Sequence, residues 1–287
     1  MEMYKKTITF IKKSDKYNSL VIYNEANNFS VGANLALFLF AANIAMWNEI
    51  ESQIEDGQKT YQALKYAPFP VVSAPSGLAL GGGCEILLHS DAIQAHSETY
   101  MGLVEAGVGI IPGWGGCKEM ILRLKNNPKT PGGPMAALLK VFEIIGTAKV
   151  AKSAFEAKEF GFLTTNDDIT MNKDRLLFDA KQKAIKLSKN YTPPINQECS
   201  LPGETGLATM KLAINDLSLK GQITSHDKIV AEALAKVITG GNTDITETLN
   251  ENDLLKLERK MFLKLSKTQG TLDRMEHMLN TGKPLRN

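Results

Sequence analysis

The sequence predicts a mixed α/β fold, in which short buried strands in the first half precede a helical second half. Two apolar runs bounded by turn residues carry the strand prediction, Leu20–Tyr23 and Val71–Ala74. A third observation is the stretch 126–134, which is rich in Pro, Gly and Asn; beyond it, apolar residues recur mostly at helical spacing. We therefore expect an α/β core over residues 1–146 and an all-helical region over residues 147–287.

The first half is expected to alternate strands with helices. Apolar residues at helical spacing from Leu35 to Ile54 predict one long helix over residues 35–65, which Pro68 ends. Good helix formers after a run of glycines predict a helix that begins near Cys84. The remaining elements expected here are helices over residues 4–13 and 118–124 and strands over residues 92–95 and about 99–103. The second half is expected to hold helices over residues 135–145, 149–160, 171–190, 206–219, 227–239, 252–266 and 272–279.

Composition argues against several classes of function. The 33 Lys and Arg residues against 31 Asp and Glu leave a net charge of +2, whereas a dedicated nucleic-acid binder needs a basic face. The three cysteines and four histidines are scattered, with neither a disulfide framework nor a metal-ligand spacing. Asparagines interrupt the uncharged stretch 26–48, whose apolar run is far shorter than the ~20 residues of a membrane span. The first residues lack the apolar core of a signal peptide. Taken together, these observations predict a cytoplasmic protein with no metal site and no membrane contact.

Two glycine-flanked loops are the strongest chemical feature, Phe29-Ser-Val-Gly-Ala33 and Leu80-Gly-Gly-Gly-Cys-Glu85. Three consecutive glycines are costly in backbone entropy, and are tolerated where the backbone must approach another group closely. The second loop opens a helix, whose first N–H groups and dipole favour an anion. The loops therefore fit a cradle for a negatively charged oxygen, although a tight strand-to-helix turn without a ligand explains a glycine run alone equally well.

Competing motifs fail on their spacing. Gly107-x-Gly109 is followed three residues later by Pro112 rather than glycine, and GxxxxGK[ST] is absent, so no nucleotide cradle is predicted. GxSxG is absent too, which excludes a nucleophile elbow.

Two glutamates stand beside these loops. Glu85 lies in the first turn of the expected helix, and Glu105 lies between the expected strand at 99–103 and the loop 107–116. Each alone is more typical of a helix-start charge or a surface residue than of a catalyst. Together, beside an oxyanion-binding loop, they can supply a general base and a general acid for adding or removing water next to a polarised carbonyl.

Three motifs occur in one order along the chain, Phe29-Ser-Val-Gly-Ala-Asn-Leu35, Gly77-Leu-Ala-Leu-Gly-Gly-Gly-Cys-Glu85 and Glu105-x-Gly-x-Gly-Ile-Ile-Pro-Gly-x-Gly-Gly116. Their order and spacing resemble the crotonase (enoyl-CoA hydratase/isomerase) superfamily over residues 4–165. The stretches 99–105, 245–249 and 276–287 are similar to the C-terminal hydratase part of bacterial bifunctional 3-hydroxyacyl-CoA dehydrogenase/enoyl-CoA hydratase chains.

The resemblance implies a crotonase-like ββα spiral core before the helical region, assembled as homotrimers or dimers of trimers. It implies that the N–H groups of Ala33 and Gly82 form an oxyanion hole for an acyl-CoA thioester, with coenzyme A present only as part of the substrate and no tightly bound cofactor. By the same analogy Glu85 activates water for attack at C3 of a trans-2-enoyl-CoA, and Glu105 delivers the proton to C2. The residues expected to line the substrate site are Phe29, Ser30, Gly32, Asn34, Gly81, Gly83, Pro112, Gly113 and Trp114.

The chain departs from the family pattern at its beginning and at two site positions. Only 28 residues precede Phe29, so the family's opening β-hairpin and part of the coenzyme A pocket are expected to be missing. This predicts a detached piece of a longer bifunctional protein, either a split gene product or the result of a mis-called start, without a dinucleotide-binding domain. A separate dehydrogenase chain is then a candidate partner. Trp114 is larger than the usual residue and is expected to shorten the acyl pocket, while Asn34 replaces a common Asp.

Three functions remain open on the sequence alone. Hydration of 2-enoyl-CoA in fatty-acid β-oxidation is favoured by the two glutamates and both loops. Isomerisation of enoyl-CoA needs only one of the two carboxylates. A catalytically weak remnant or association module, which binds acyl-CoA and needs a separate 3-hydroxyacyl-CoA dehydrogenase chain, follows from the missing hairpin.

Overall fold

The computed structural model describes residues 1–287, which divide into two compact units. None of the helices combines the length and the apolar character that crossing a bilayer requires. The boundary expected after residue 146 stays a prediction. Unit 1 comprises Met1–Gly32, Asp56–Gly102 and Val150–Ile195, and unit 2 comprises Ala33–Glu55, Leu103–Lys149 and Asn196–Asn287.

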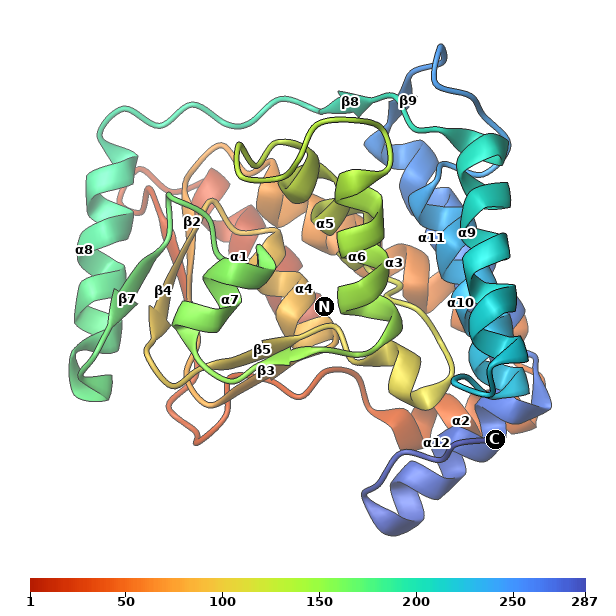
Figure 1. The fold of residues 1–287 in the computed structure, drawn as a ribbon. Helices are drawn as coiled ribbons and strands as arrows, with labels where there is room; N and C mark the ends of the chain where they lie inside the picture. The colour runs from red at the N-terminus through yellow and green to blue at the C-terminus, as the bar shows by residue number, and fades with distance from the viewer. The chain divides into compact units, whose positions relative to one another are not determined.

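Unit 1 is built on a four-stranded parallel sheet with the strand order β1-β2-β4-β7 (Figure 1). All four residues of β2 are buried, as expected for a strand inside a parallel sheet. Leu20 of β1 pairs with Val71, and Val72 pairs with Ala92 of β4. The strands are β1 (Leu20–Tyr23), β2 (Val71–Ala74), β4 (Ala92–His96) and β7 (Asp168–Thr170).

Helix α8 (Leu176–Ser188) packs on this sheet (Figure 1). Its buried residues Leu176, Ala180 and Ala184 recur every four positions and form one apolar face with Val72 and its neighbours in the strands. The two alanines keep this face narrow, so that the helix can approach the strands closely.

A second sheet of unit 1 carries the glycine run. Its strand order is β3-β5-β6, with the first pair parallel and the second antiparallel. Gly81 alone separates β3 from the helix α4. The elements are β3 (Leu78–Leu80), α4 (Gly82–Leu88), β5 (Tyr100–Gly102) and β6 (Val150–Ala151), and unit 1 also holds α1 (Glu2–Lys12), α7 (Ala154–Phe160) and η2 (Lys173–Arg175).

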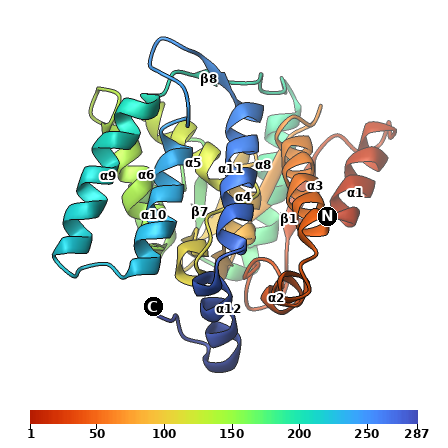
Figure 2. The same ribbon diagram turned by 90° about the vertical axis from the view of Figure 1, so that its right-hand side faces the viewer.

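Unit 2 is mainly helical. Helix α10 (Ser225–Ile238) contacts α9, α11 and α6 (Figure 2). Capping boxes at Thr224 and Asn250 begin α10 and α11. Helix α3 (Trp47–Lys65) begins in unit 2 and ends in unit 1. The other elements are α2 (Leu35–Asn43), η1 (Glu105–Val108), α5 (Gly116–Lys125), α6 (Ala136–Gly146), β8 (Glu198–Cys199), α9 (Gly203–Leu219), β9 (Leu249–Asn250), α11 (Glu251–Ser266) and α12 (Gln269–Thr281).

The predicted fold class is confirmed, and α1 precedes β1 with no strand before it. Two details were wrong. The single helix expected over residues 35–65 is broken between Asn43 and Trp47, where Ala45 adopts a left-handed φ of 57° that no helix contains. The region beyond residue 146 is not all helical, because β6, β8 and β9 lie there and β7 extends the parallel sheet. Only one of its three residues is buried, which is too short a pattern to predict a strand.

Candidate active site

The two glycine-flanked loops lie against each other in unit 1. Ser30 is bridged to β3, since its N–H donates to the carbonyl of Leu78 at 3.0 Å and its carbonyl accepts from the N–H of Leu80 at 2.9 Å. The N–H of Phe29 donates to the carbonyl of Ser76 at 2.9 Å. The first loop is therefore fixed to the second by backbone hydrogen bonds.

Close approach explains the glycines. A Cβ on Gly83 would lie 2.6 Å from the Cβ of Ser30 and 2.7 Å from its carbonyl oxygen, so no larger residue fits. A Cβ on Gly32 would lie 3.3 Å from the backbone N of Gly82. The packing therefore brings the first loop beside the backbone N of Gly82, which the sequence predicts as an oxyanion donor.

Buried side chains support the start of α4. The hydroxyl of Tyr61 donates to the carbonyl of Gly82 at 3.1 Å, and Nδ1 of His89 donates to the backbone carbonyl of Glu85 at 2.7 Å. Glu85 itself is 2% exposed, so its carboxylate lies in a desolvated setting. Sequence reasoning missed Tyr61, because its partner is 21 residues away and no local pattern points to it.

Glu105 begins the short turn η1 in unit 2 and is half-buried. Its backbone carbonyl accepts from the N–H of Ile110 at 3.2 Å. Gly109 ends the turn with a left-handed φ of 84°. Two side chains of α12, Thr271 and Arg274, donate to carbonyls of this loop.

The rest of the third motif packs inside unit 2. Pro112 and Gly113 are buried, and a Cβ on Gly113 would lie 2.9 Å from the ring of Phe262 in α11. Trp114 is half-buried. Its expected effect on the acyl pocket stays a prediction.

Asn34 has a structural role that the sequence left open. Its side chain accepts a hydrogen bond from the N–H of Leu37 at 3.1 Å and caps the beginning of α2. Asn and Asp are comparable at this position, which accounts for the replacement of the family's common Asp. Its assignment to the substrate site stays a prediction.

The structure divides the predicted site residues between the units. Within unit 1 it brings Phe29, Ser30 and Gly32 together with the glycine run at 81–83. The pairing of Glu85 with Glu105 and of Ala33 with Gly82 stays a prediction. No group of three or more His, Cys, Asp or Glu side chains is placed to hold a metal ion. Unit 1 holds Phe29, Ser30, Gly32, Gly81, Gly82, Gly83 and Glu85, and unit 2 holds Ala33, Asn34, Glu105, Pro112, Gly113 and Trp114.

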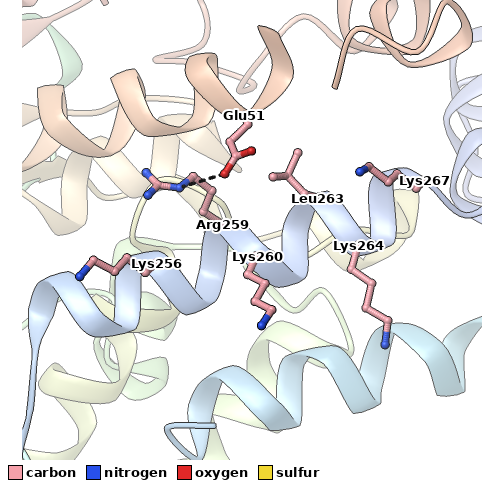
Figure 3. Close-up of a pocket in the computed structure, with 7 residues that line it drawn as sticks. All are labelled: Glu51, Lys256, Arg259, Lys260, Leu263, Lys264 and Lys267. Atoms are coloured by element: carbon pink, nitrogen blue, oxygen red, sulfur yellow. Dashed lines mark ion pairs between the residues drawn. The ribbon is translucent and has the colours of Figure 1, made fainter. Parts of the chain in front are cut away.

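A hollow of ≈ 520 Å³ lies in unit 2 along α11 (Figure 3), and none of the predicted site residues lines it. Arg259 points toward Glu51 and lies 3.9 Å from its carboxylate and 3.6 Å from that of Glu55. The lysines lining the hollow are exposed and form a solvated cationic face of the helix. They are Lys256, Lys260, Lys264 and Lys267.

Comparison with known proteins agrees with this architecture. Residues 4–125 match the enoyl-CoA hydratase/isomerase family. The crystal structure of enoyl-CoA hydratase from Bacillus halodurans has a TM-score of 0.63 and 17% identity, over 96% of this chain and 88% of that one. Residues 4–125 belong to the crotonase superfamily. A crotonase-superfamily structure from Mycobacterium paratuberculosis, described as an enoyl-CoA hydratase/isomerase, has a TM-score of 0.60 and 16% identity, over 95% and 85% of the two chains.

Curated relatives of this chain, which carries the crotonase-superfamily match, are much longer. It is 45% identical over 272 residues to the probable 3-hydroxyacyl-CoA dehydrogenase of Bacillus subtilis (strain 168), covering 94% of this chain and 34% of that protein. It is 32% identical over 267 residues to the candidate fatty acid oxidation complex trifunctional enzyme of Rickettsia prowazekii (strain Madrid E), covering 93% and 34%. The chain spans about a third of the length of these relatives. Its family supports a general crotonase-type reaction.

Proposed function

We propose that the chain hydrates trans-2-enoyl-CoA to 3-hydroxyacyl-CoA in fatty-acid β-oxidation. The N–H groups of Ala33 and Gly82 hold the thioester oxygen, on which negative charge develops as an enolate forms. Glu85 takes a proton from water while the water oxygen bonds to C3, and Glu105 gives a proton to C2. The hydroxyl ends on C3 and the added hydrogen on C2, so water is consumed and no redox cofactor takes part.

One observation carries this proposal, namely the packing of the loop around Ser30 onto the start of α4. Gly83 fits there only because it has no side chain, and Tyr61 holds the carbonyl of Gly82. A backbone donor fixed in this way needs no reorganisation as charge develops, and one such donor contributes about 3 kcal/mol to transition-state stabilisation. Glu85 lies buried in the same turn, three residues after Gly82.

Two further functions stay candidates. The first is isomerisation of enoyl-CoA, since the matched family includes isomerases. Isomerisation moves a proton between C4 and C2 and needs one carboxylate, whereas this chain has two. The name of the longer Bacillus subtilis relative favours the second candidate, a catalytically weak association module that binds acyl-CoA and pairs with a separate 3-hydroxyacyl-CoA dehydrogenase chain. A dehydrogenase partner and a homotrimer or dimer of trimers belong to the same proposal.

Assay of the purified chain with crotonyl-CoA tests the proposal. The wild type is expected to consume the enoyl thioester, and Glu85→Gln and Glu105→Gln are each expected to lower kcat by about 100-fold or more, since each removes a proton-transfer group. Glu204→Gln, an exposed change in unit 2, serves as the control and is expected to match the wild type. Wild-type turnover no higher than that of the Glu85→Gln/Glu105→Gln double variant would refute the enzyme. Conversion of a 3-enoyl-CoA without hydration would favour the isomerase.

A further inference from the structure

The turn that carries Glu105 is short and depends on support from outside. η1 contains only four residues, and the backbone hydrogen bonds at its ends run from the N–H groups of Gly107, Gly109 and Ile110 to the carbonyls of Val104, Ala106 and Glu105. A single 3₁₀ turn has poorer hydrogen-bond geometry than an α-helix and is not stable by itself. The position of Glu105 is therefore set by whatever holds the turn.

Thr271 of α12 holds one end of this turn. Its side chain is fully buried, and its hydroxyl donates to the carbonyl of Gly109 at 2.7 Å. The hydroxyl has a single hydrogen, so Nε2 of His226, 3.0 Å away, is the donor of the second hydrogen bond. A Cβ on Gly109 would lie 2.8 Å from the Thr271 hydroxyl, so α12 packs directly on the turn.

Arg274, one helical turn further along α12, holds the middle of the turn. Its side chain is 3% exposed, and Nη1 donates to the carbonyl of Ala106 at 3.3 Å. The other arms of the guanidinium are fixed, because Nη2 donates to Asp227 at 2.7 Å and Nε donates to Asn287 at 2.8 Å. Asp227 is in turn held by the capping box at Thr224. The guanidinium therefore cannot swing away from Ala106 without breaking several charge-assisted hydrogen bonds.

We infer that Thr271 and Arg274 are positioning residues for Glu105. They lie in the helical second half, fix two of the carbonyls that follow Glu105, and thereby hold the carboxylate that the proposed function uses as the acid. A general acid must stay close to its productive geometry, and a misplacement of about 1 Å can cost about 100-fold in rate. This inference rests on the proposed function, because it gives the clamp a role in proton delivery to C2.

The pair Thr271→Val and Thr271→Ser tests the clamp. Valine keeps the shape of threonine but loses the hydroxyl, whereas serine keeps the hydroxyl. Thr271→Val is expected to speed amide hydrogen exchange in the peptide 103–112 by roughly tenfold. It is expected to lower kcat for crotonyl-CoA by about 10- to 100-fold with KM within about twofold. Thr271→Ser is expected to stay within about threefold of the wild type on both measures.

Thr239→Val is the matched control. Thr239 is also fully buried, and its hydroxyl donates within α10 to the carbonyl of Ala235 at 2.8 Å. Loss of the Thr239 hydroxyl is expected to leave both the amide hydrogen exchange of the peptide 103–112 and kcat unchanged. A loss of kcat as large as that of Thr271→Val would show a general effect of destabilisation and would overturn the inference.

A double-variant cycle with Glu105→Gln decides whether Thr271 acts through Glu105. If it does, Thr271→Val adds no further loss of kcat in the Glu105→Gln background. The inference would be overturned if the loss of kcat in the double variant equalled the product of the two single losses. It would also be overturned by a Thr271→Val variant in which amide hydrogen exchange of 103–112 has risen but kcat is that of the wild type. If Thr271→Val does not fold, Arg274→Lys, which keeps the charge but not the reach to Ala106, is subject to the same expectations. A wild-type chain without turnover refutes the proposed function itself, whatever the exchange result.

Discussion

The two units fix their candidate site residues by different means. In unit 1 the loop around Ser30 is fixed to β3 by backbone hydrogen bonds, and contact with Gly83 leaves no room for a side chain. In unit 2 the turn at Glu105 is fixed by side chains from another helix, above all Thr271 and Arg274. Unit 1 should therefore be most sensitive to added atoms, and unit 2 to the loss of a polar or charged group.

The largest effect is expected from adding atoms in unit 1. Gly83→Val would place a Cβ 2.6 Å from Ser30, and the backbone of both loops must move to relieve the overlap. We expect a loss of about 5 kcal/mol or more in the free energy of unfolding, measured by urea denaturation, and no detectable hydration. Gly132→Val is the control, because a Cβ at Gly132 meets nothing within 4 Å. A Gly83→Val protein as stable and active as the control would contradict the tight contact.

The next largest effect is expected from removing a charge in unit 2. The Lys118 side chain is fully buried, and its Nζ contacts the carboxylates of Glu119 and, at 2.7 Å, Glu251. Burial alone lowers the pKa of Lys118, but the two carboxylates outweigh it and raise this pKa above its usual 10.5. Protonated Lys118 therefore stabilises the folded chain fully below pH 10.5, and this stabilisation is lost as the pH rises through the pKa of Lys118 in the folded state.

Lys118→Met leaves the two carboxylates buried without their cation. We expect it to lower the free energy of unfolding by about 3–5 kcal/mol. Lys220→Met breaks an ion pair with Asp216 whose side chains are both 58% exposed, and it is expected to cost less than about 1 kcal/mol. Equal losses for the two substitutions would show that the buried ion pairs of Lys118 stabilise the fold no more than an exposed ion pair does.

A smaller effect is expected from Tyr61→Phe in unit 1. It removes the hydrogen bond to the carbonyl of Gly82 and keeps the buried ring. We expect a loss of about 1–2 kcal/mol in the free energy of unfolding, together with a lower kcat. Tyr17→Phe, at a 46% exposed tyrosine, is the control and should be neutral. No change in either quantity for Tyr61→Phe would mean that this bond does not support the start of α4.

The smallest effect is expected from mild acid on unit 2. Burial and the nearby Arg274 lower the pKa of His226 below 6.5, although Asp227 and Asp273 oppose this shift. The folded chain then binds fewer protons at His226 than the unfolded chain, so stability falls as the pH drops from 6.5 toward the folded pKa.

Asp227 adds a second loss at lower pH. Burial alone raises its pKa, but hydrogen bonds from Thr224 and Arg274 outweigh it and hold the pKa below 3.8. The stabilisation from Asp227 is therefore lost only as the pH falls below 3.8.

His226→Gln tests the contribution of the histidine. It keeps a donor toward Thr271 and removes the imidazole that titrates, so the free energy of unfolding of this variant should change less than that of the wild type between pH 7.5 and 5.5. Equal changes in the two proteins would contradict the assignment to His226.

Features that depend on neighbouring residues in the sequence were predicted well, whereas features that depend on contacts between distant residues were missed. Leu20–Tyr23 and Val71–Ala74 were predicted with the bounds that the structure shows, because each is a continuous apolar run between turn residues. The close approach at Gly83 was predicted from the cost of three glycines, although the group approached proved to be the neighbouring loop.

The determinants of unit 2 lay beyond such local patterns. Thr271 and Arg274 lie 162 and 168 residues from the carbonyls they hold, and a single Thr or Arg in a helix carries no signal of a distant partner. The break in the helix at Ala45 was missed for a related reason. Alanine favours helices, and only the tertiary setting imposes a left-handed φ on it.

The proposed hydration requires that a fixed thioester enolate is protonated at C2 while water adds at C3. Incubation of crotonyl-CoA with the wild-type chain in D₂O, followed by NMR of the product, tests both events at once. The expected product is 3-hydroxybutyryl-CoA with one deuterium at C2, formed at a rate that Glu85→Gln and Glu105→Gln each lower by about 100-fold or more. Recovery of unhydrated crotonyl-CoA from the wild-type incubation, or product formation as fast in the two variants as in the wild type, would contradict this mechanism.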